Sequence, residues 1–234
     1  MIPQKIVTID GPAGAGKSTL ARDLAKYLGW IYLDTGALYR ALALTALSRG
    51  VDCGDREASE SLAARLNLTV SPEPQGTVIA VDGENITERL RAPEVSRMAS
   101  VISAWPGVRE TLLGIQRSLG ERGEVVTEGR DMGTVVFPQA GLKLFLQASP
   151  EARARRRHLE LAAKGEGVTP EEVLRDIVAR DQADSSRAVS PLAAAPDAVL
   201  IDSTNLDIEA VFKVIIRAFH NRFVAPSKNG TLSA

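Results

Sequence analysis

A glycine-rich loop between a strand pattern and a helix pattern constrains the fold of this chain more than any other feature of its sequence. The stretch GPAGAGKST, which begins at Gly11, follows the apolar run KIVTI. After the loop, Leu20, Leu24 and Leu28 recur at helical spacing. The sequence therefore predicts a buried strand over residues 5–10, a tight loop, and a helix that starts where the loop ends.

The residues of this loop are those that hold a phosphate group. Gly11, Gly16, Lys17 and Ser18 have the spacing of the phosphate-binding loop, in which small residues let the backbone curl and point N–H groups at an anion. Lys17 would place a positive charge on the outer phosphates, and Ser18 would offer its hydroxyl to Mg²⁺. The start of the next helix would add a favourable dipole end. A glycine-rich turn without a ligand is the alternative, but the flanking patterns favour the phosphate site.

Strand patterns alternate with helix patterns along the chain, which is typical of a parallel sheet covered by helices on both faces. The predicted strands are KIVTI, IYLD, EVVTE, LKLFLQA and AVLID, at residues 5–9, 31–34, 124–128, 142–148 and 198–202. We therefore expect an α/β fold with a doubly wound, five-stranded parallel core.

The segment LNLTVSPEPQGTVIAVDGENI, which starts at Leu66, interrupts this alternation. Apolar and polar residues alternate on either side of a Pro/Gly turn, and DGEN supplies a second turn. This pattern predicts an antiparallel hairpin or a three-stranded insert. The segment after about residue 222 has no periodicity, and we expect it to be flexible.

Two further motifs follow predicted strands and favour a second anion site. In LDTGALYR, Thr35 would present its hydroxyl and N–H at the entrance of a helix, with Arg40 about one turn further in. Glu128, Arg130 and Asp131 follow the third strand at its carboxyl end, where open α/β sheets bind ligands. A salt bridge that closes a loop is the alternative for this second motif.

Two later helix patterns each place charged residues on one face. The first, opened by a proline, has Arg153, Arg156 and Arg157 at i, i+3 and i+4, and the second has Arg180, Asp184 and Arg187 at i, i+4 and i+7. A solvated face with salt bridges is the usual interpretation of an isolated arginine-rich helix. Phosphoryl transfer, however, needs cations over the migrating group and a lid that excludes water, so beside a phosphate-binding loop we expect these roles.

Charge and cysteine content exclude other classes of protein. The chain has 28 Lys and Arg against 29 Asp and Glu, a formal net charge of −1, so binding to nucleic acid is not indicated. The single cysteine, Cys53, excludes an intrachain disulfide and fits a reducing compartment. We find neither a secretory signal pattern nor an apolar run of membrane-spanning length. We therefore expect a cytoplasmic protein with no membrane partner.

From about Ile6 to Asn221 the chain resembles the bacterial cytidylate kinases. The resemblance rests on VTIDGPAGAGKST, LDTGALYR, VRETLL, GRDMGTVVFP, DSSRAVSPL and LIDST, together with the inserted segment and the arginine-rich lid helix. Many kinases share the first motif, whereas GRDMGTVVFP and the insert are much narrower. The resemblance implies transfer of the ATP γ-phosphate to CMP or dCMP with Mg²⁺, and we expect a monomer.

The same resemblance implies a division of the chain. A core with a phosphate-binding loop would comprise residues 1–35 and 105–222, including a helical lid at about 150–188. Residues 36–104 would form the domain that binds the nucleoside monophosphate, with the antiparallel insert at about 66–87. Residues 223–234 would be a flexible tail.

Individual roles are also implied by the resemblance. The donor phosphates would lie on Gly11, Pro12, Ala13, Gly14, Ala15, Gly16, Lys17, Ser18 and Thr19. The acceptor would meet Thr35, Arg40, Arg130 and Arg187 through its phosphate, Ser100, Arg109 and Asp131 through its cytosine edge, and Arg180 and Asp184 through its sugar. The catalytic side chains would be Lys17, Arg130, Arg187 and the lid residues Arg153, Arg156 and Arg157. Either Asp34 or Glu128 could support Mg²⁺.

Three other functions stay open at this point. A GTPase switch would carry the strings Asn-Lys-x-Asp and Asp-x-x-Gly, and the chain contains neither. A kinase for a different nucleotide or for a metabolite hydroxyl would use the same loop, since the loop alone does not select the acceptor. A module that binds nucleotide without turnover is the non-enzymatic alternative.

Overall fold

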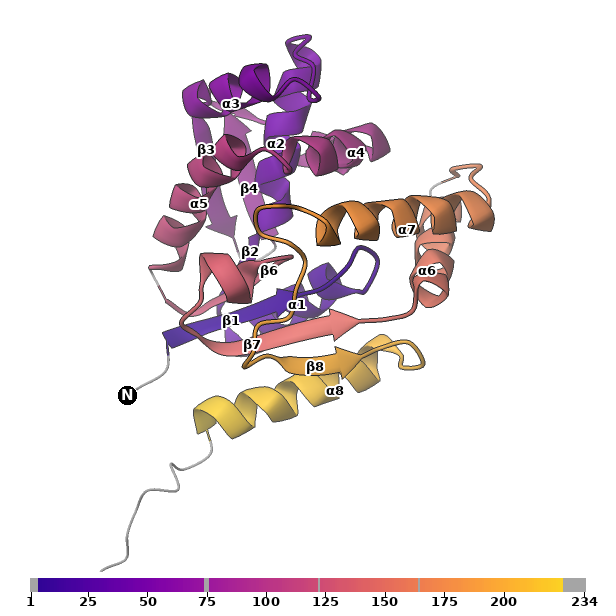
Figure 1. The fold of residues 1–234 in the computed structure, drawn as a ribbon. Coiled ribbons are helices and arrows are strands. Elements are labelled where there is room, and N and C mark those ends of the chain that lie inside the picture. Colours follow the sequence, from indigo (N-terminus) through magenta and orange to yellow (C-terminus); the bar gives the residue numbers. More distant parts are fainter. Residues whose placement is uncertain (1–3, 74–75, 122, 164, 225–234) are drawn as a thin grey trace, which may run out of the picture.

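The structure is a computed structural model that describes residues 4–73, 76–121, 123–163 and 165–224. Its centre is a parallel sheet with the strand order β2-β6-β1-β7-β8 (Figure 1). These strands are β1 (Gln4–Asp10), β2 (Ile31–Asp34), β6 (Val125–Gly129), β7 (Ala140–Gln147) and β8 (Val199–Asp202). The helices are α1 (Lys17–Leu28), α2 (Thr35–Ser48), α3 (Arg56–Arg65), α4 (Pro93–Ile102), α5 (Pro106–Gly120), α6 (Pro150–Ala162), α7 (Pro170–Ser185) and α8 (Ile208–Phe219), with short turns η1 (Thr87–Arg91), η2 (Met132–Val136) and η3 (His220–Val224). The predicted five-stranded parallel core is confirmed.

Both faces of the sheet are covered, as the apolar strand patterns require. Val7 and Ile9 of β1 belong to a buried cluster that α1 and α8 complete. Ile6 points the other way and packs with Met132 and Val136 of η2. Successive side chains of β1 therefore point to opposite sides of the sheet, and both sides are covered. The loop that follows β1 starts from this buried layer.

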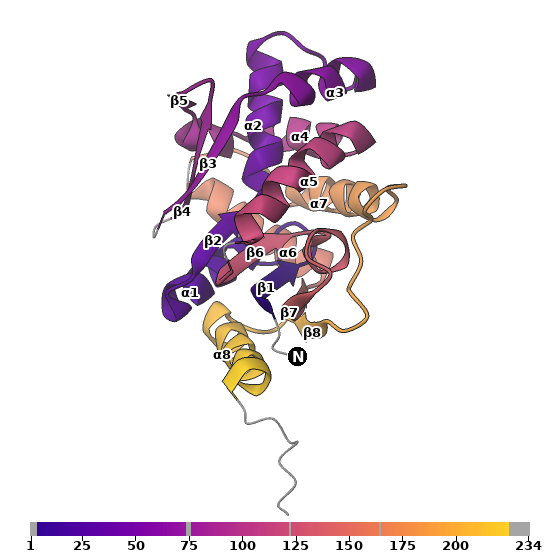
Figure 2. The ribbon, with the colours of Figure 1, turned by 90° about the vertical axis from the view of Figure 1, so that its left-hand side faces the viewer.

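The predicted antiparallel insert is confirmed. Strands β3 (Leu68–Glu73), β4 (Gly76–Val81) and β5 (Glu84–Asn85) form a separate antiparallel sheet in that order. The DGEN turn between β4 and β5 has positive φ angles of 51° at Asp82 and 86° at Gly83, as a tight hairpin turn requires. This small sheet stands beside α2, on the side of the molecule away from α8 (Figure 2).

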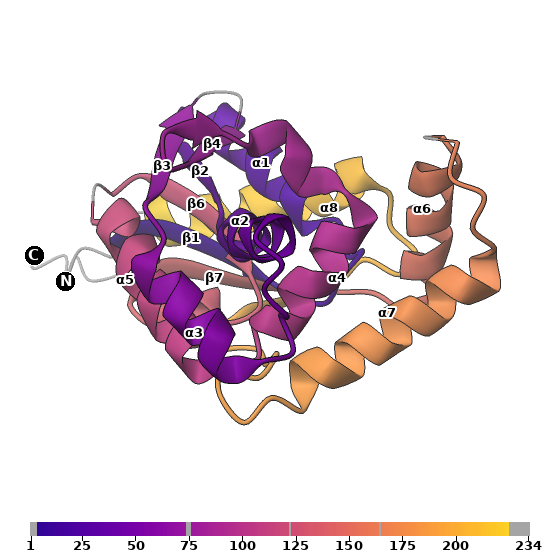
Figure 3. The ribbon, with the colours of Figure 1, turned by 90° about the horizontal axis from the view of Figure 1, so that it is seen from above.

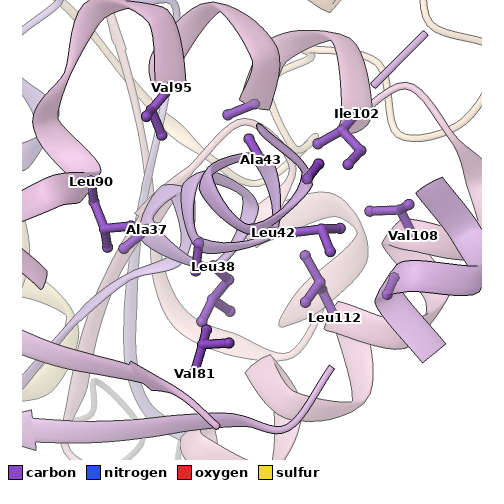
Figure 4. Packing of buried hydrophobic residues seen from close by; sticks show 14 of the residues in the cluster. Ala37, Leu38, Leu42, Ala43, Val81, Leu90, Val95, Ile102, Val108 and Leu112 are labelled. Atoms are coloured by element: carbon purple, nitrogen blue, oxygen red, sulfur yellow. The ribbon is translucent and has the colours of Figure 1, made fainter. Parts of the chain in front are cut away.

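Helix α2 is the centre of a second buried cluster (Figure 4). Leu38 and Leu42 are fully buried against side chains from β4, α4 and α5. Helix α5 joins the two parts of the molecule, because Leu112 lies in this cluster while Leu119 packs with Val125 of the parallel sheet.

Helices α6 and α7 pack against each other at the margin of the molecule (Figure 3). Ala154 and Leu161 of α6 meet Val173 and Ile177 of α7 in a small apolar cluster of their own. The pair spans most of residues 150–188, for which the sequence predicts a helical lid. Its apolar cluster has far fewer buried members than the clusters around α2 and the parallel sheet.

The chain after α8 stays packed for longer than the sequence predicts. Phe223 lies with its ring centroid 5.9 Å from that of Trp30 and 4.8 Å from that of Phe219. Phe223, the first residue of the predicted tail, is therefore packed, because this aromatic side chain has partners on α8 and beside α1. Residues 225–234 of the predicted tail lie outside the described residues.

Candidate active site at the carboxyl ends of the strands

The glycine-rich loop connects β1 to α1 and approaches β7 closely. A Cβ atom on Gly11 would lie 2.0 Å from the carbonyl oxygen of Leu146, so only glycine fits there. Gly16 precedes α1 with a φ of 94°, which favours glycine and turns the chain into the helix. The loop therefore has the tight curvature that the phosphate-binding pattern predicts.

Lys17 lies inside this loop. Its Nζ donates to the carbonyl oxygen of Pro12 at 2.7 Å, and the residue is 5% exposed. Burial, followed by the guanidinium of Arg130, lowers the pKa of Lys17 to about 7. A negatively charged ligand in the loop would favour the charged form of Lys17 and so offset both its burial and its repulsion by Arg130.

The structure separates the two acids that the sequence leaves as alternatives for Mg²⁺. Ser18 donates its hydroxyl to the carboxylate of Glu128. Asp34 has different partners. It accepts from Arg40 at 2.7 Å and from the backbone N–H of Ala37, in the first turn of α2, at 3.0 Å. Glu128 is therefore the acid that adjoins the loop hydroxyl.

Thr35 differs in detail from the expectation. Helix α2 begins at Thr35 itself, with Asp34 as the residue that caps it. The Thr35 hydroxyl donates to the carbonyl oxygen of Glu128 at 2.7 Å. It therefore ties α2 to the end of β6 instead of presenting a free hydroxyl at a helix entrance.

Arginines from four segments gather next to the loop. Arg130 donates through Nε to Asp184 at 2.7 Å, and Arg187 pairs with the other oxygen of the same carboxylate. Although burial would raise the pKa of Asp184, Arg130 and Arg187 lower it below its usual range. The structure thus brings together residues that lie more than fifty positions apart in the sequence.

Positive charge is in excess in this arginine cluster. It contains four guanidinium groups and two carboxylates, from Arg40, Arg130, Arg180, Arg187, Asp34 and Asp184. Burial and then Arg130 lower the pKa of Arg180 to about 10, so it stays charged at neutral pH. The Arg180 Nε is buried and has no hydrogen-bond partner among the described residues. A site with uncompensated buried cations is built to receive an anion.

A second group of predicted residues lies beside this cluster. Arg109 and Asp131 form a buried ion pair, and Arg109 also donates to the carbonyl oxygen of Ser103 at 3.2 Å. The Arg109 guanidinium lies 5.5 Å from the centre of the Tyr39 ring. Arg109, Asp131 and Tyr39 line a cavity of about 260 Å³, which exceeds the volume of one pyrimidine ring. Ser100 contributes its carbonyl oxygen, which accepts from the Ser103 hydroxyl at 2.9 Å.

The side chains of the three lid arginines diverge to different partners, although their spacing places them on one side of α6 as the sequence predicts. Arg153 is 3% exposed and donates to the carbonyl oxygens of Ala148 and Ala13 at 2.8 and 3.0 Å, with Asp181 as its ion partner at 2.6 Å. Arg156 points to Ser203 instead, and Arg157 pairs with Glu160 on its own helix. Among the three, Arg153 is the one that touches the glycine-rich loop.

The stripe predicted for Arg180, Asp184 and Arg187 is correct only in part. Helix α7 ends at Ser185, so Arg187 lies beyond the helix and not on the stripe with Arg180 and Asp184. Arg187 reaches Asp184 from the following loop and also donates to the Ser103 hydroxyl at 2.9 Å. Although the helix has ended, the Arg187 side chain therefore still pairs with the carboxylate of Asp184.

Comparison with known proteins decides the family. The family model described as "Cytidylate kinase" matches residues 7–221. The chain belongs to the cytidylate kinase family. It is similar to the cytidylate kinase of Solibacter usitatus (strain Ellin6076), with 50% identity over 219 residues that cover 93% of each chain. It is 48% identical over 211 residues to that of Pelotomaculum thermopropionicum, covering 90% of this chain and 93% of the relative.

A solved gluconokinase from Sinorhizobium meliloti 1021 aligns with 97% of this chain and 100% of its own, at 15% identity and a TM-score of 0.48. This likeness is too weak to bear on the acceptor. Membership in the cytidylate kinase family removes the GTPase switch from the alternatives. None of the helices in the described part of the chain is long and apolar enough to cross a membrane.

The sequence prediction missed Ser103, which links the arginine cluster to Arg109. Its hydroxyl accepts from Arg187 and donates to Ser100, while its carbonyl oxygen accepts from Arg109. A single serine at the end of α4 gives no signal of its own in the sequence. The only signal is its position in the sequence between Ser100 and Arg109, two residues that the family resemblance assigns to the cytosine edge.

Proposed function

We propose that this chain transfers the γ-phosphate of ATP to CMP or dCMP and releases ADP with CDP or dCDP. The observation that carries the proposal is the arginine cluster, whose excess positive charge lies close enough to Lys17 to lower its pKa. Two anion sites that repel each other when empty are suited to hold two phosphates whose charges they offset. Family membership supports cytidine nucleotides as the acceptors.

The donor phosphates would lie on the backbone N–H groups of the glycine-rich loop, with Lys17 at the γ-phosphate. The acceptor phosphate would lie against Arg40, Arg130 and Arg187. One of its oxygens, already anionic, attacks the γ-phosphorus as the bond to the β,γ-bridging oxygen breaks, and ADP leaves with that electron pair. Catalysis of this kind is positioning plus charge stabilisation, so no covalent intermediate on the protein is required.

The donor set beside the loop fits Mg²⁺. Ser18 and Glu128 offer hydroxyl and carboxylate oxygens, which are the ligands that this ion prefers. No group of three or more His, Cys, Asp or Glu side chains in the described ranges could hold a metal alone. Phosphate oxygens would therefore complete the shell, and the ion would supply charge neutralisation on the phosphates.

The lid contact of Arg153 supports a role in closing the site. Arg153 joins α6 to Ala13 of the loop and to Asp181 of α7. A guanidinium in this position can exchange a backbone carbonyl for a donor phosphate oxygen, which is the stronger, charge-assisted partner. Arg156 and Arg157 have other partners in the structure, so we assign the lid's contact with the donor to Arg153.

A coupled assay of ADP release tests the function with a panel of acceptors that contains CMP, dCMP, UMP, AMP and GMP. We expect CMP and dCMP to be phosphorylated with the highest kcat/KM. Equal activity with every nucleotide would contradict a cytosine-specific site, and nucleotide binding without ADP release would favour the non-enzymatic module.

Residues 66–87 are proposed to belong to a mobile domain that binds the acceptor, with α6 and α7 as the lid. CMP is therefore expected to slow hydrogen exchange in β3, β4 and the lid while the β1, β6 and β7 amides change little. Exchange is measured by mass spectrometry with and without each nucleotide. Protection that needs ATP and is not produced by CMP would assign the insert to the wrong substrate.

Binding of MgATP at pH 8 is expected to take up about one proton per site. Lys17, with its pKa lowered to about 7, is mostly neutral at that pH in the empty site. A triphosphate beside it favours the charged form and raises its pKa again. Calorimetry in buffers of different ionisation enthalpy measures the uptake, and Lys17→Met is the control. Equal proton uptake by both proteins would rule Lys17 out as its source.

A further inference from the structure

The carboxylate of Asp10 lies where the donor loop and the acceptor loop meet. Asp10 is the last residue of β1 and directly precedes Gly11. It is opposite Gly129, the last residue of β6, in the parallel register. Its exposed fraction is 4%, so it is not a surface group.

Both oxygens of Asp10 accept from the backbone of the segment that follows β6. Oδ1 accepts from the N–H of Met132 at 2.9 Å, and Oδ2 accepts from the N–H of Gly133 at 2.7 Å. The strand pairing of β6 ends at Gly129, so these bonds fix the segment after the sheet has stopped holding it. A Cβ on Gly133 would lie 3.0 Å from Thr8 Oγ1 and 3.2 Å from Lys143 Cδ, which shows how closely this backbone packs on the sheet.

The segment that Asp10 holds carries two predicted acceptor residues. Arg130 reaches Asp184 and Asp131 reaches Arg109, and both side chains leave the backbone within three residues of the Asp10 contacts. A shift of this backbone would displace the group that reads the base together with a cation over the phosphate. Displacements of about 1 Å at such groups cost large factors in rate.

Burial disfavours a charged carboxylate. If Asp10 only filled space, a neutral side chain of the same size would therefore be more stable at this position. Burial raises the pKa of Asp10 to about 6, and the N–H groups of Gly133 and Met132 oppose that rise. Among the charged groups that face it, Asp131 raises the pKa further and Lys17 lowers it. The ionised carboxylate is the form that can accept from two N–H donors at once, because it has no proton on either oxygen.

We propose that Asp10 is a positioning residue for acceptor selection, whose carboxylate fixes Arg130 and Asp131 in register with the donor loop. This inference rests on the proposed function. It adds that the donor loop and the choice of base are connected through one side chain that touches neither substrate.

The test is Asp10→Asn, which keeps the size but turns one acceptor oxygen into a donor that faces an N–H. The ratio of kcat/KM for CMP to that for UMP is expected to fall by about tenfold, while the KM for ATP stays within about twofold. Asp55→Asn is the matched control, because Asp55 also accepts from a backbone N–H, that of Ala58, but it caps α3, away from the site. A ratio that is unchanged in Asp10→Asn, or reduced equally in Asp55→Asn, overturns the proposal.

Two further measurements cover the other outcomes. If Asp10→Asn does not fold, the same ratio is measured in the wild-type protein from pH 8 to pH 5.5, above the range in which the ring nitrogen of cytosine gains a proton. Titration of the nucleotide phosphate and of Lys17 affects both acceptors and cancels, so the ratio should fall as Asp10 gains a proton near pH 6. A constant ratio overturns the proposal.

A wild-type protein with no turnover of CMP would refute the proposed function and leave the positioning of the loop to be judged by hydrogen exchange. In Asp10→Asn, the amides of Met132 and Gly133 should exchange faster than in the wild type, with the amides of the glycine-rich loop unchanged. Equal exchange at Met132 and Gly133 in the two proteins would reject Asp10 as the residue that fixes this segment.

Discussion

Lys17→Ala is expected to lower kcat by about 10²- to 10³-fold or more while the fold and the affinity for CMP stay nearly unchanged. Lys17 is the buried cation of the donor loop, and its single hydrogen bond goes to the carbonyl oxygen of Pro12. Its removal takes away the charge that would stabilise the transferring phosphoryl group. Because burial and Arg130 both disfavour the charged form of Lys17, the loss of this cation should offset part of the cost of losing the Pro12 hydrogen bond, and the melting temperature should change little.

The measurements are steady-state kinetics, a thermal melt and CMP binding by calorimetry. Lys213→Ala is the control, since Lys213 pairs with Glu209 on the exposed side of α8 and should not affect turnover. Near-normal turnover in Lys17→Ala would remove the basis for a phosphate-binding loop in this chain.

Asp131→Asn is expected to reduce kcat/KM for CMP far more than for UMP. Cytosine presents an amino donor beside an unprotonated ring nitrogen, whereas uracil presents a carbonyl beside a protonated one. An ionised Asp131 can accept from the cytosine amine and its partner Arg109 can donate to the ring acceptors, whereas uracil would aim its carbonyl at the carboxylate and its ring N–H at the guanidinium. Each unsatisfied buried group costs about 1–3 kcal/mol, and an asparagine can turn its amide N–H toward the uracil carbonyl.

The same substitution breaks the buried pair with Arg109, so stability must be measured alongside the kinetics. Glu124→Gln is the control, because it breaks the exposed Lys5–Glu124 ion pair at the amino ends of β1 and β6, opposite the site. If the CMP-to-UMP ratio is the same in Asp131→Asn and the wild type, Asp131 holds the loop and the cytosine is read by other residues.

Local patterns in the sequence predict the sheet and the donor loop well. The apolar run KIVTI, the loop glycines and the spacing of Leu20 and Leu24 act over a few residues, and the structure has β1, the loop and α1 where they indicate. The antiparallel insert is likewise visible in a strict two-residue alternation. Such patterns reflect backbone geometry and burial on one face, which neighbours in sequence determine.

The directions of long side chains depend on partners that sequence spacing does not reveal. Helical spacing correctly brings Arg180 and Asp184 together, yet Arg153 and Arg156 diverge because one finds Asp181 and the other finds Ser203. Arg187 keeps its predicted partner although the helix ends two residues before it. Flexible arginines follow the nearest acceptors, and those come from segments distant in the chain.

The position of α5 determines how the molecule can deform. Because Leu112 is fixed in the cluster around α2 and Leu119 in the cluster below the parallel sheet, this helix belongs to both bodies at once. Sliding one body across the other would break close-packed contacts at one end of α5, whereas a rotation about its long axis keeps most of them. Helix α5 therefore transmits any displacement of the cluster around α2 to the parallel sheet. Arg109 lies on the first turn of this shared helix, so it is carried by the element that connects the two parts.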